Sequence, residues 1–499
     1  MCGFVCLWRA GDVALARRMI DRIVHRGPDE LQVSQLPGVP AVMAHCRLAI
    51  IGPEAGTQPI WRGDDVLIAN GEIYNYADLR AILGEASFAT QSDSETILHL
   101  FRARLPRWIA RLDGVFAFVL ATPKRVVAAR DPLGIKSIYV ARIGGGLAFA
   151  SELKAFDGLG LEEAQAIAPG TLFDSQGGVR RWFRMPHGAA ELEPGGAPEP
   201  IWRELRLVLE EAVKKWLVAD VEVGAFLSGG LDSSIIAALA ARLSERPLKT
   251  FAVGVEGSAD LAAARRVAAH IDAEHRELTF TAADLAAVLP HVVYHLESAD
   301  VDLVRSALPT HFATTLARRH VKAVLTGEGA DELFAGYAYH HAYLGRPRAL
   351  ADEITRSLGT MHNINLQRVD RITMAQGLEA RTPFLDRELI AFAQSIPATL
   401  KIKAGDRAGG GTIEKWILRK ACEDLLPPAL IWRKKAQFDE GSGTVAALDE
   451  ALGQASGLAP PIDRAAEGAL YERLLRDQYA DPELILDAAG RWVADRVDA

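Results

Sequence analysis

Short runs of apolar residues, separated by Gly, Pro and Asn turns, run through roughly the first 185 residues of the chain. Two stretches interrupt them in which apolar positions recur with helical spacing, at 14–24 and 94–104. Strands are predicted by the apolar runs at 66–69, 115–120, 126–129, 137–141 and 147–150. We therefore expect a layered domain in which strands and helices alternate with short connections.

A different pattern follows residue 200. Residues 185–200 hold four prolines, three glycines and three glutamates, which predicts an exposed linker. We place a boundary there, between a domain at 1–190 and a second at 191–499. In the second domain, helical patterns alternate with buried-strand runs at 222–227, 250–255 and 323–325, which predicts a parallel sheet covered by helices. From residue 449 onward the pattern is helical and carries no chemistry that we can identify.

Length and charge narrow the class of protein. The 499 residues are enough for two to four domains with large cores. The net charge of 56 − 64 = −8 argues against a nucleic-acid or anionic-membrane partner. No apolar run approaches the ~20 residues that a membrane-spanning helix needs. The four cysteines form no CxxC pair and no zinc-type cluster, so we expect a reducing, cytoplasmic setting without structural disulfides.

One cysteine stands at a position with its own chemistry. If an aminopeptidase removes Met1, the Cys2 residue carries both a thiol and a free α-amino group. That amine titrates near ~8, so at neutral pH a useful fraction is neutral and can accept the proton of the thiol. Cys2 would then be a nucleophile that brings its own base, although a cysteine at position 2 alone is weak evidence.

The surrounding motifs make that evidence strong. Seven of them occur in order: CGFV at 2–5, HRGPD at 25–29, RLAI at 47–50, NGEIYN at 70–75, SDSE at 92–95, RDPLGIK at 130–136 and SELKA at 151–155. In order and spacing they resemble the glutaminase domain of class II amidotransferases, which are N-terminal-nucleophile hydrolases. The resemblance implies a four-layer α/β/β/α sandwich in which Cys2 attacks the side-chain amide of glutamine.

The residue types suit that substrate. Attack on a carboxamide creates an oxyanion, which the side-chain amide of Asn70 and the backbone N–H of Gly71 can stabilise. Arg47 can grip the α-carboxylate of glutamine with two hydrogen bonds. Glu72 and Asp93 supply negative charge for its α-ammonium group. We expect Arg26 and Gly27, in the HRGPD motif, to support the pocket.

The second domain carries a loop of a different kind. The segment GAFLSGGLDSSIIAAL at 224–239 places a hydrophobic strand before an SGGLDSS loop and a helical run from about Ile235. Backbone N–H groups in such a loop, with a helix N-terminus behind them, form a cradle for anions. The GKS or GKT of a Walker loop is absent. The segment resembles the PP-loop of ATP pyrophosphatases, which implies ATP binding by Leu227, Ser228, Gly229, Gly230, Asp232, Ser233, Val253 and Gly327.

Further motifs extend this resemblance: TFAVG at 250–254, LTGEGADELFAGY at 325–337, LEARTPFLD at 378–386, EKWILR at 414–419 and WRKKAQF at 432–438. Val253 is expected against the adenine. Asp232 and Asp331 are expected to hold Mg²⁺, since hard oxygen ligands suit that ion. Glu328 would order the acceptor or assist removal of a proton from attacking ammonia. Lys435 would neutralise charge on the phosphates.

Together the two domains resemble glutamine-hydrolysing asparagine synthetases over roughly residues 2–443. The resemblance implies that Cys2 releases ammonia from glutamine, that ATP activates a carboxylate as an acyl-adenylate, and that ammonia crosses the interior to attack it. Aspartate is the expected acceptor and asparagine the product. Small molecules (glutamine, ATP and the acid) are the expected partners, and the oligomeric state stays open, with a homodimer as one option. The acceptor set implied by the resemblance is Arg305, Glu328, Asp331 and Arg381.

One segment departs from the family pattern. The family reads DVTTIR where this chain has Asp302 and Leu303 in place of the two threonines, with Arg305 retained. We hypothesise that Arg305 neutralises Asp302 if the segment is helical, since residues three apart face each other. The change leaves two alternatives open: amidation of a different carboxylate in secondary metabolism, or a regulator that binds glutamine and nucleotide without catalysis.

Overall fold

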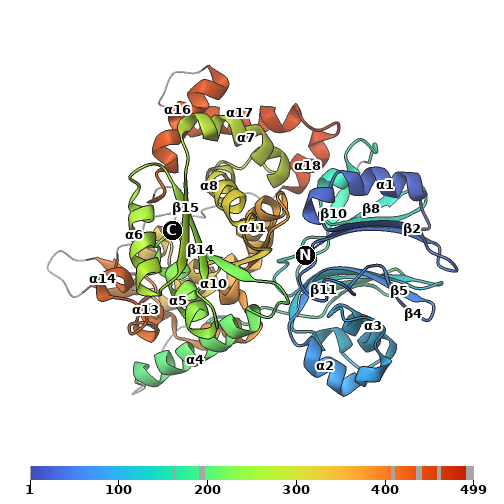
Figure 1. Cartoon of the computed structure of the whole chain (residues 1–499), viewed down its shortest axis with the longest axis horizontal. Coiled ribbons are helices and arrows are strands. Elements are labelled where there is room, and N and C mark those ends of the chain that lie inside the picture. The colour runs from blue at the N-terminus through green and yellow to red at the C-terminus, as the bar shows by residue number, and fades with distance from the viewer. Residues whose placement is uncertain are drawn as a thin grey trace.

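The computed structural model describes residues 2–161, 163–189, 197–405, 411–433, 441–457 and 462–489. Figure 1 shows an N-terminal sandwich, coloured blue to cyan, beside a larger C-terminal α/β unit, coloured green to red. The predicted boundary at residue 190 falls outside the described residues. Among the helices that the described residues form, none is long and apolar enough to cross a membrane.

Two antiparallel sheets form the centre of the N-terminal sandwich. The first has the order β10-β8-β9-β1-β3-β2 and the second the order β12-β11-β7-β6-β5-β4. The strands of the first are β1 (Cys2–Trp8), β2 (Glu30–Gln35), β3 (Ala41–Arg47), β8 (Tyr139–Ile143), β9 (Gly146–Ala150) and β10 (Ala164–Ala166). Those of the second are β4 (Ile60–Arg62), β5 (Asp65–Ile73), β6 (Gly114–Ala121), β7 (Val126–Arg130), β11 (Thr171–Asp174) and β12 (Gly178–Arg181).

Buried apolar side chains fill the space between the two sheets, among them Phe4 and Met43 of the first sheet and Ile68 and Val119 of the second. Helix α1 (Val13–Asp21) packs on the outer face of the first sheet, and α2 (Tyr76–Leu83) and α3 (Glu95–Arg102) lie on the outer side of the second (Figure 1). Both inner and outer faces are therefore covered, which explains why these strands read as continuous apolar runs. The predicted four-layer α/β/β/α sandwich is confirmed.

A five-stranded parallel sheet organises the C-terminal α/β unit, in the order β15-β14-β13-β16-β17. Its strands are β13 (Val223–Phe226), β14 (Lys249–Gly254), β15 (Glu274–Thr279), β16 (Ala323–Leu325) and β17 (Glu379–Arg381). The main covering helices are α4 (Pro198–Trp216), α5 (Leu231–Leu243), α6 (Ala259–His270), α7 (Ala282–Leu296), α8 (Val301–Ala317), α10 (Pro347–Thr360), α11 (Asn365–Met374) and α12 (Arg387–Ser395). The predicted parallel sheet is confirmed, and the helix after the SGGLDSS loop begins at Leu231 rather than near Ile235.

Further elements complete the unit. They are α9 (Ala330–Phe334), α13 (Trp416–Ala421), α14 (Pro428–Ile431), α16 (Thr444–Ser456), α17 (Arg464–Arg476), α18 (Pro482–Ala488) and the small hairpin β18 (Lys403–Ala404) with β19 (Thr412–Ile413). In the described residues of the whole chain, short 3₁₀ segments occur at Val24–Arg26, Glu85–Ser87, Trp108–Arg111, Leu153–Phe156, Ala338–Tyr343, Met361–Asn363, Pro383–Leu385 and Ala398–Leu400.

The C-terminal helices tie the two parts of the molecule together. Helix α18 packs beside β10 of the sandwich (Figure 1), and just before it the Asp481 carboxylate accepts from the backbone N–H of Gly158 at 3.0 Å. The backbone N–H of Asp481 in turn donates to Asp157 at 2.8 Å. On the other side, the Tyr479 hydroxyl donates to the carbonyl of Tyr294 on α7 at 2.6 Å. The segment that showed no chemistry in the sequence therefore fastens the sandwich to α7.

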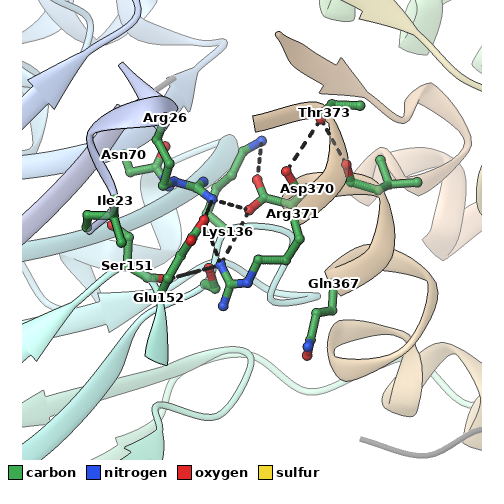
Figure 2. Close-up of polar contacts among 12 residues, drawn as sticks. Ile23, Arg26, Asn70, Lys136, Ser151, Glu152, Gln367, Asp370, Arg371 and Thr373 are labelled. Carbon is green, nitrogen blue, oxygen red and sulfur yellow. Dashed lines mark hydrogen bonds and ion pairs between the residues drawn. The ribbon is translucent and has the colours of Figure 1, made fainter. Parts of the chain in front are cut away.

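Buried charged side chains lie at the boundary between the two parts, alongside apolar clusters that contain residues of both. We call these charged side chains the boundary ion cluster. Its N-terminal members lie on turns of the sandwich, and the others lie just after α7 and on α11. Figure 2 shows five of them, Arg26, Lys136, Glu152, Asp370 and Arg371. All seven side chains are 5% exposed or less. The members are Arg26, Lys136, Glu152, Lys154, Glu297, Asp370 and Arg371.

Each acid of this cluster meets cations from the opposite part of the molecule. Glu297 lies 3.0 Å from Lys154 of the sandwich, and it also accepts from the backbone N–H of that residue at 2.7 Å. Arg371 lies 3.0 Å from Glu297 and 3.4 Å from Glu152 of the sandwich. It also donates to the Ser137 hydroxyl at 2.8 Å. Buried charges are tolerated only when they are paired in this way.

We expect Arg371→Met to destabilise the protein strongly, because it leaves Glu297 and Glu152 buried with fewer cations. Breaking a buried pair from one side costs about 3–5 kcal/mol. Adding Glu297→Gln removes one of the stranded charges, so the double variant should regain part of the loss. Urea unfolding followed by tryptophan fluorescence measures both. A double variant that is less stable than Arg371→Met alone would contradict this electrostatic account.

Candidate active sites

The two sheets of the sandwich meet around Cys2 at the start of β1. Cys2 pairs in register with Arg47 at the end of β3. From the facing sheet, the side-chain carbonyl of Asn70 on β5 accepts from the backbone N–H of Cys2 at 2.9 Å. The Arg26 guanidinium holds the other side of the residue, because its Nε donates to the Cys2 carbonyl at 3.0 Å. The main chain of Cys2 is thus fixed from two directions.

The side-chain amide of Asn70 is available for a ligand. Asn70 is fully buried, and its Nδ2 has no hydrogen-bond partner among the described residues. A buried donor without a partner is costly, so an unpaired amide beside a candidate nucleophile fits an oxyanion that forms during reaction. Gly71 follows with a φ of 150°, and a Cβ there would lie 2.0 Å from the Val115 carbonyl oxygen. Only glycine therefore fits this position.

Three further residues predicted to bind glutamine gather near Cys2. Arg47 donates to the carbonyl oxygens of Gly52 at 2.6 Å and Pro53 at 3.0 Å, which orders the loop after β3. Glu72 and Asp93 are buried, and burial raises the pKa of each carboxyl above its usual range. A bound ammonium group would oppose that effect. Binding of the α-ammonium of an amino acid would therefore lower both pKa values and favour the charged carboxylates that it requires.

The thiol itself is not a ready nucleophile. Burial raises the pKa of the Cys2 thiol above its ordinary value, although the neighbouring Arg47 acts in the opposite direction. The thiol is therefore protonated at neutral pH, and attack on an amide requires a base close to the sulfur.

The second site is a cavity at the carboxyl ends of β13, β14 and β16, where ligands of open parallel sheets bind. The residues predicted from sequence that line it are Leu227, Ser228, Gly230, Asp232, Ser233, Val253, Gly327, Glu328 and Asp331. Gly229 lies behind this lining with a φ of 72°, and a Cβ there would come within 2.5 Å of the Ala264 backbone nitrogen.

The two carboxylates predicted to hold Mg²⁺ converge in this cavity. Asp232 is in the first turn of α5 and Asp331 in the first turn of α9, and the Lys415 ammonium lies 2.5 Å from one and 2.6 Å from the other. Burial alone would lower the pKa of Lys415, but Asp232 and Asp331 raise it above its ordinary value. Two hard oxygen donors at one point fit a magnesium site. Within the described part of the chain, no group of three or more metal-binding side chains completes it.

Gly336 allows Lys415 to reach this point. A Cβ on Gly336 would lie 1.9 Å from an oxygen of Asp331 and 2.0 Å from Cε of Lys415, so any other residue would block the contact. The sequence reasoning named the EKWILR motif but gave Lys415 no role. A lysine within a recognised motif was the signal that could have identified it.

Two other cations in the cavity were also missed. Arg368 on α11 lines the cavity, lies 2.5 Å from Glu328 and donates to the Thr310 hydroxyl at 3.1 Å. Arg433 donates to the Gly229 carbonyl at 2.9 Å and pairs with Asp260 at 3.0 Å. The predicted phosphate-binding Lys435 lies outside the described residues. The cavity thus presents several cations to a polyanion such as a nucleoside triphosphate.

Two residues of the predicted acceptor set lie elsewhere. Arg381, on β17, is buried and donates to the carbonyls of Trp216 and Val218 at 2.7 and 2.8 Å, and its Nε pairs with Glu379 at 2.5 Å. It holds β17 against the end of α4 and does not line the cavity.

Arg305 is also turned away from the cavity. It pairs with Glu467 on α17 at 2.6 Å, while Asp302 pairs with Arg464 on the same helix at 2.7 Å. The hypothesis that Arg305 neutralises Asp302 is therefore wrong as the main contact: each residue has its own partner on α17. Leu303 is buried in an apolar cluster with residues of α7 and α17. The departure from the family pattern thus lies on the face of α8 that packs against α17, whereas the cavity is lined by Thr310 and Ala313.

Known proteins match the chain in the same order as its two parts. A family model described as "Glutamine amidotransferase domain" matches residues 1–170, and one described as "Asparagine synthase" matches residues 204–352 and 342–491. Glutamine-hydrolyzing asparagine synthetase 3 of Arabidopsis thaliana is 38% identical over 89% of this chain and 79% of its own length. Glutamine-hydrolyzing asparagine synthetase 2 of Oryza sativa subsp. japonica and the Zea mays enzyme of that name are each 37% identical, over 89% of this chain and 78% of theirs.

One acid on the cavity wall has an unusual environment. Glu332 is 1% exposed, and its carboxylate accepts from the Tyr337 hydroxyl at 2.5 Å and from the Asn365 amide at 2.7 Å. Burial, followed by the nearby charge of Asp331, raises the pKa of Glu332 to about 7. The folded protein therefore holds a proton on Glu332 at pH values where the unfolded chain has released it.

This difference predicts how stability depends on pH. The unfolded carboxyl releases its proton near its ordinary pKa of 4.5, but the folded one keeps it until about 7, so the free energy of unfolding falls as pH rises between these values. Two to three pKa units correspond to roughly 3 kcal/mol. Glu332→Gln removes this group, so its stability relative to the wild type should increase from pH 5 to pH 8. Urea unfolding at several pH values measures it, and a difference that is independent of pH would contradict the assignment.

Proposed function

This chain belongs to the family of glutamine-hydrolysing asparagine synthetases, and from that premise we propose that it transfers the amide nitrogen of glutamine to aspartate with hydrolysis of ATP to AMP and pyrophosphate. The observation that carries the proposal is the presence in one chain of two separate prepared sites. One has a thiol beside an unpaired amide donor, and the other has paired carboxylates and cations at the end of a parallel sheet.

The first half-reaction follows from the Cys2 site. After removal of Met1, the α-amino group takes the thiol proton, and the sulfur attacks the side-chain carbonyl of glutamine. Asn70 and Gly71 donate to the oxyanion, the C–N bond breaks, and ammonia leaves after gaining the proton. Water then cleaves the thioester to give glutamate. We propose that Glu72 and Asp93 bind the α-ammonium of glutamine and that Arg47 binds its carboxylate.

The second half-reaction belongs to the cavity. ATP and the carboxylate of aspartate form an acyl-adenylate and pyrophosphate, and ammonia then attacks the acyl carbon, which releases AMP. Bound Mg²⁺, held by Asp232 and Asp331, would neutralise charge on the phosphates. The loop residues Ser228 to Ser233 and the cations Lys415 and Arg433 would surround the phosphate groups, and Val253 would contact the adenine.

Arg368 takes the acceptor role that was predicted for Arg381. It lines the cavity and holds Glu328, so it can orient both the aspartate and the carboxylate that assists attack by ammonia. Arg305 would act indirectly, because it fixes α8, which lines the cavity with Thr310 and Ala313. A phosphate-binding role for Lys435, a cytoplasmic site of action, the absence of a nucleic-acid partner and a homodimer all stay predictions.

The transfer of ammonia requires an enclosed route. Ammonia that escapes into water at pH 7 is mostly protonated and no longer nucleophilic. We therefore propose passage through the interior between the two parts, past the boundary ion cluster.

Cys2→Ala should abolish asparagine formation from glutamine, with a fall on the order of 1000-fold or more, because the nucleophile is lost. Synthesis from ammonium salts should remain within about 2-fold of the wild type, since that chemistry lies in the other site. Measurement of asparagine and AMP with each nitrogen source tests this. Cys6→Ala is the matched control, a buried thiol on the same strand that faces the core between the sheets. Normal glutamine-dependent synthesis by Cys2→Ala would disprove the assignment of Cys2 as the nucleophile.

Restoring the two threonines of the family pattern should leave the acceptor site unchanged. Asp302→Thr should alter the KM for aspartate by less than about 2-fold, because Asp302 faces Arg464 and not the cavity. Leu303→Thr should instead lower thermal stability, since it places a hydroxyl in an apolar core. Arg368→Lys, in the cavity wall, should raise the KM for aspartate and serves as the positive control. A markedly lower KM in Asp302→Thr would show that this segment does reach the acceptor.

A further inference from the structure

Asp370 reaches across the boundary from the C-terminal α/β unit to the nucleophile of the other part. It is on α11 and is 5% exposed. Figure 2 shows its carboxylate pointing toward Arg26 of the sandwich, at 2.9 Å, with Lys136 at 3.8 Å on its other side. Among the described residues of the C-terminal unit, Asp370 is the acid that contacts Arg26 directly.

Arg26 passes this contact on to Cys2. Its guanidinium is fully buried, with Nη1 between Asp370 and Glu152 and with Nε donating to the Cys2 carbonyl at 3.0 Å. Burial would lower the pKa of Arg26, and Asp370 gives the largest opposing contribution, ahead of Glu152. A single side chain thus joins a carboxylate of one part of the molecule to the main chain of the nucleophile in the other.

The position of that carbonyl matters for the reaction. Besides the pairing of β1 with β3, the side chains of Asn70 and Arg26 hold the Cys2 main chain. Asn70 also faces the oxyanion, so its geometry cannot relax to compensate for movement of Cys2. A displacement of about 1 Å at a reacting atom can cost about 100-fold in rate.

The helix that carries Asp370 also reaches the other site. Two residues earlier, Arg368 lines the nucleotide cavity and holds Glu328 at 2.5 Å. Two residues of one turn of α11 therefore each contact a group of a different site: Arg368 contacts Glu328, and Asp370 contacts Arg26. Helix α11 is the rigid element that fixes the distance between them.

We propose that Asp370 is a positioning residue for glutamine hydrolysis, which acts across the boundary by fixing Arg26 and, through it, the Cys2 carbonyl. The inference rests on the proposed role of Cys2 as the glutaminase nucleophile. The competing explanation is that Asp370 only neutralises the buried cations Arg26 and Lys136. In that case its loss would lower stability without a specific effect on the rate of hydrolysis.

Asp370→Asn in the full chain separates the two explanations, because it keeps the shape and removes the charge. We expect kcat for glutamine hydrolysis to fall about 10-fold or more, with the KM for glutamine and the rate of ammonia-dependent synthesis within about 2-fold of the wild type. Glu297→Gln is the matched control. Glu297 belongs to the same buried cluster but contacts Lys154 and Arg371 rather than Arg26. It should lower thermal stability to a similar degree and leave kcat within about 2-fold.

A double-mutant cycle tests the route through Arg26. Arg26→Gln should lower kcat at least as much as Asp370→Asn, and the double variant should be no slower than Arg26→Gln alone. If Asp370→Asn does not fold, Arg26→Lys provides the test from the other side. It keeps the charge against Asp370 and Glu152, but one ammonium cannot also hold the Cys2 carbonyl. A kcat for Arg26→Lys equal to that of the wild type would then overturn the proposal.

The remaining outcomes are distinct. Equal losses of kcat in Asp370→Asn and Glu297→Gln, in step with their stability, would reduce Asp370 to charge neutralisation and overturn the inference. An unchanged kcat in Asp370→Asn would do the same. A wild-type protein that does not hydrolyse glutamine at all would instead refute the proposed function on which the inference rests.

Discussion

The burial of seven charged side chains at one boundary constrains every other part of this structure. Each charge lost its hydration when the sandwich and the C-terminal α/β unit came together, and such a loss costs several kcal/mol per ion unless partners replace the water. The partners come from both parts, and across the boundary Glu297 meets Lys154, Arg371 meets Glu152, and Asp370 meets Arg26. A docking mode shifted by a few ångströms would leave several of these groups buried and unpaired. The ions therefore add little net stability but strongly disfavour wrong arrangements of the two parts.

An arrangement fixed in this way carries consequences for the elements around it. Helix α11 contributes Asp370 and Arg371 to the boundary and Arg368 to the cavity, so its position is set from both sides. Helix α17 secures the neighbouring α8 through the Arg305–Glu467 pair, while the segment around Asp481 ties the same C-terminal region to the sandwich. A reactive intermediate that must pass between two sites benefits from such rigidity, because neither site can move independently of the other.

The sequence predicted most helices and strands and most residues that line the cavity. It did not predict the partners of side chains whose position depends on tertiary contacts. Apolar runs located β6, β7, β8 and β9 within two residues, because the covered sheets leave no polar alternation to confuse them, whereas the run at 66–69 found only the first half of β5. The motifs located the loop at Ser228 and the Asp232–Asp331 pair. Arg381 and Arg305 were assigned to the cavity from their motifs alone, and a motif does not reveal which wall a side chain faces. The spacing of Asp302 and Arg305 on α8 is compatible with a pair, but α17, more than 150 residues later, offers each a better partner.

The boundary ion cluster was out of reach of any pattern of apolar and polar positions, which assigns charged residues to the surface. The cavity also contains charged side chains that are held together by mutual pairing. Asp232 and Asp331 converge closely enough to repel each other. Lys415 lies between them and offsets that repulsion, and Gly336 leaves just enough room for its buried ammonium group. The two acids are thus held in position before any ligand arrives. A preorganised charge arrangement of this kind avoids reorganisation at the moment of reaction, which is where electrostatic catalysis gains most of its effect.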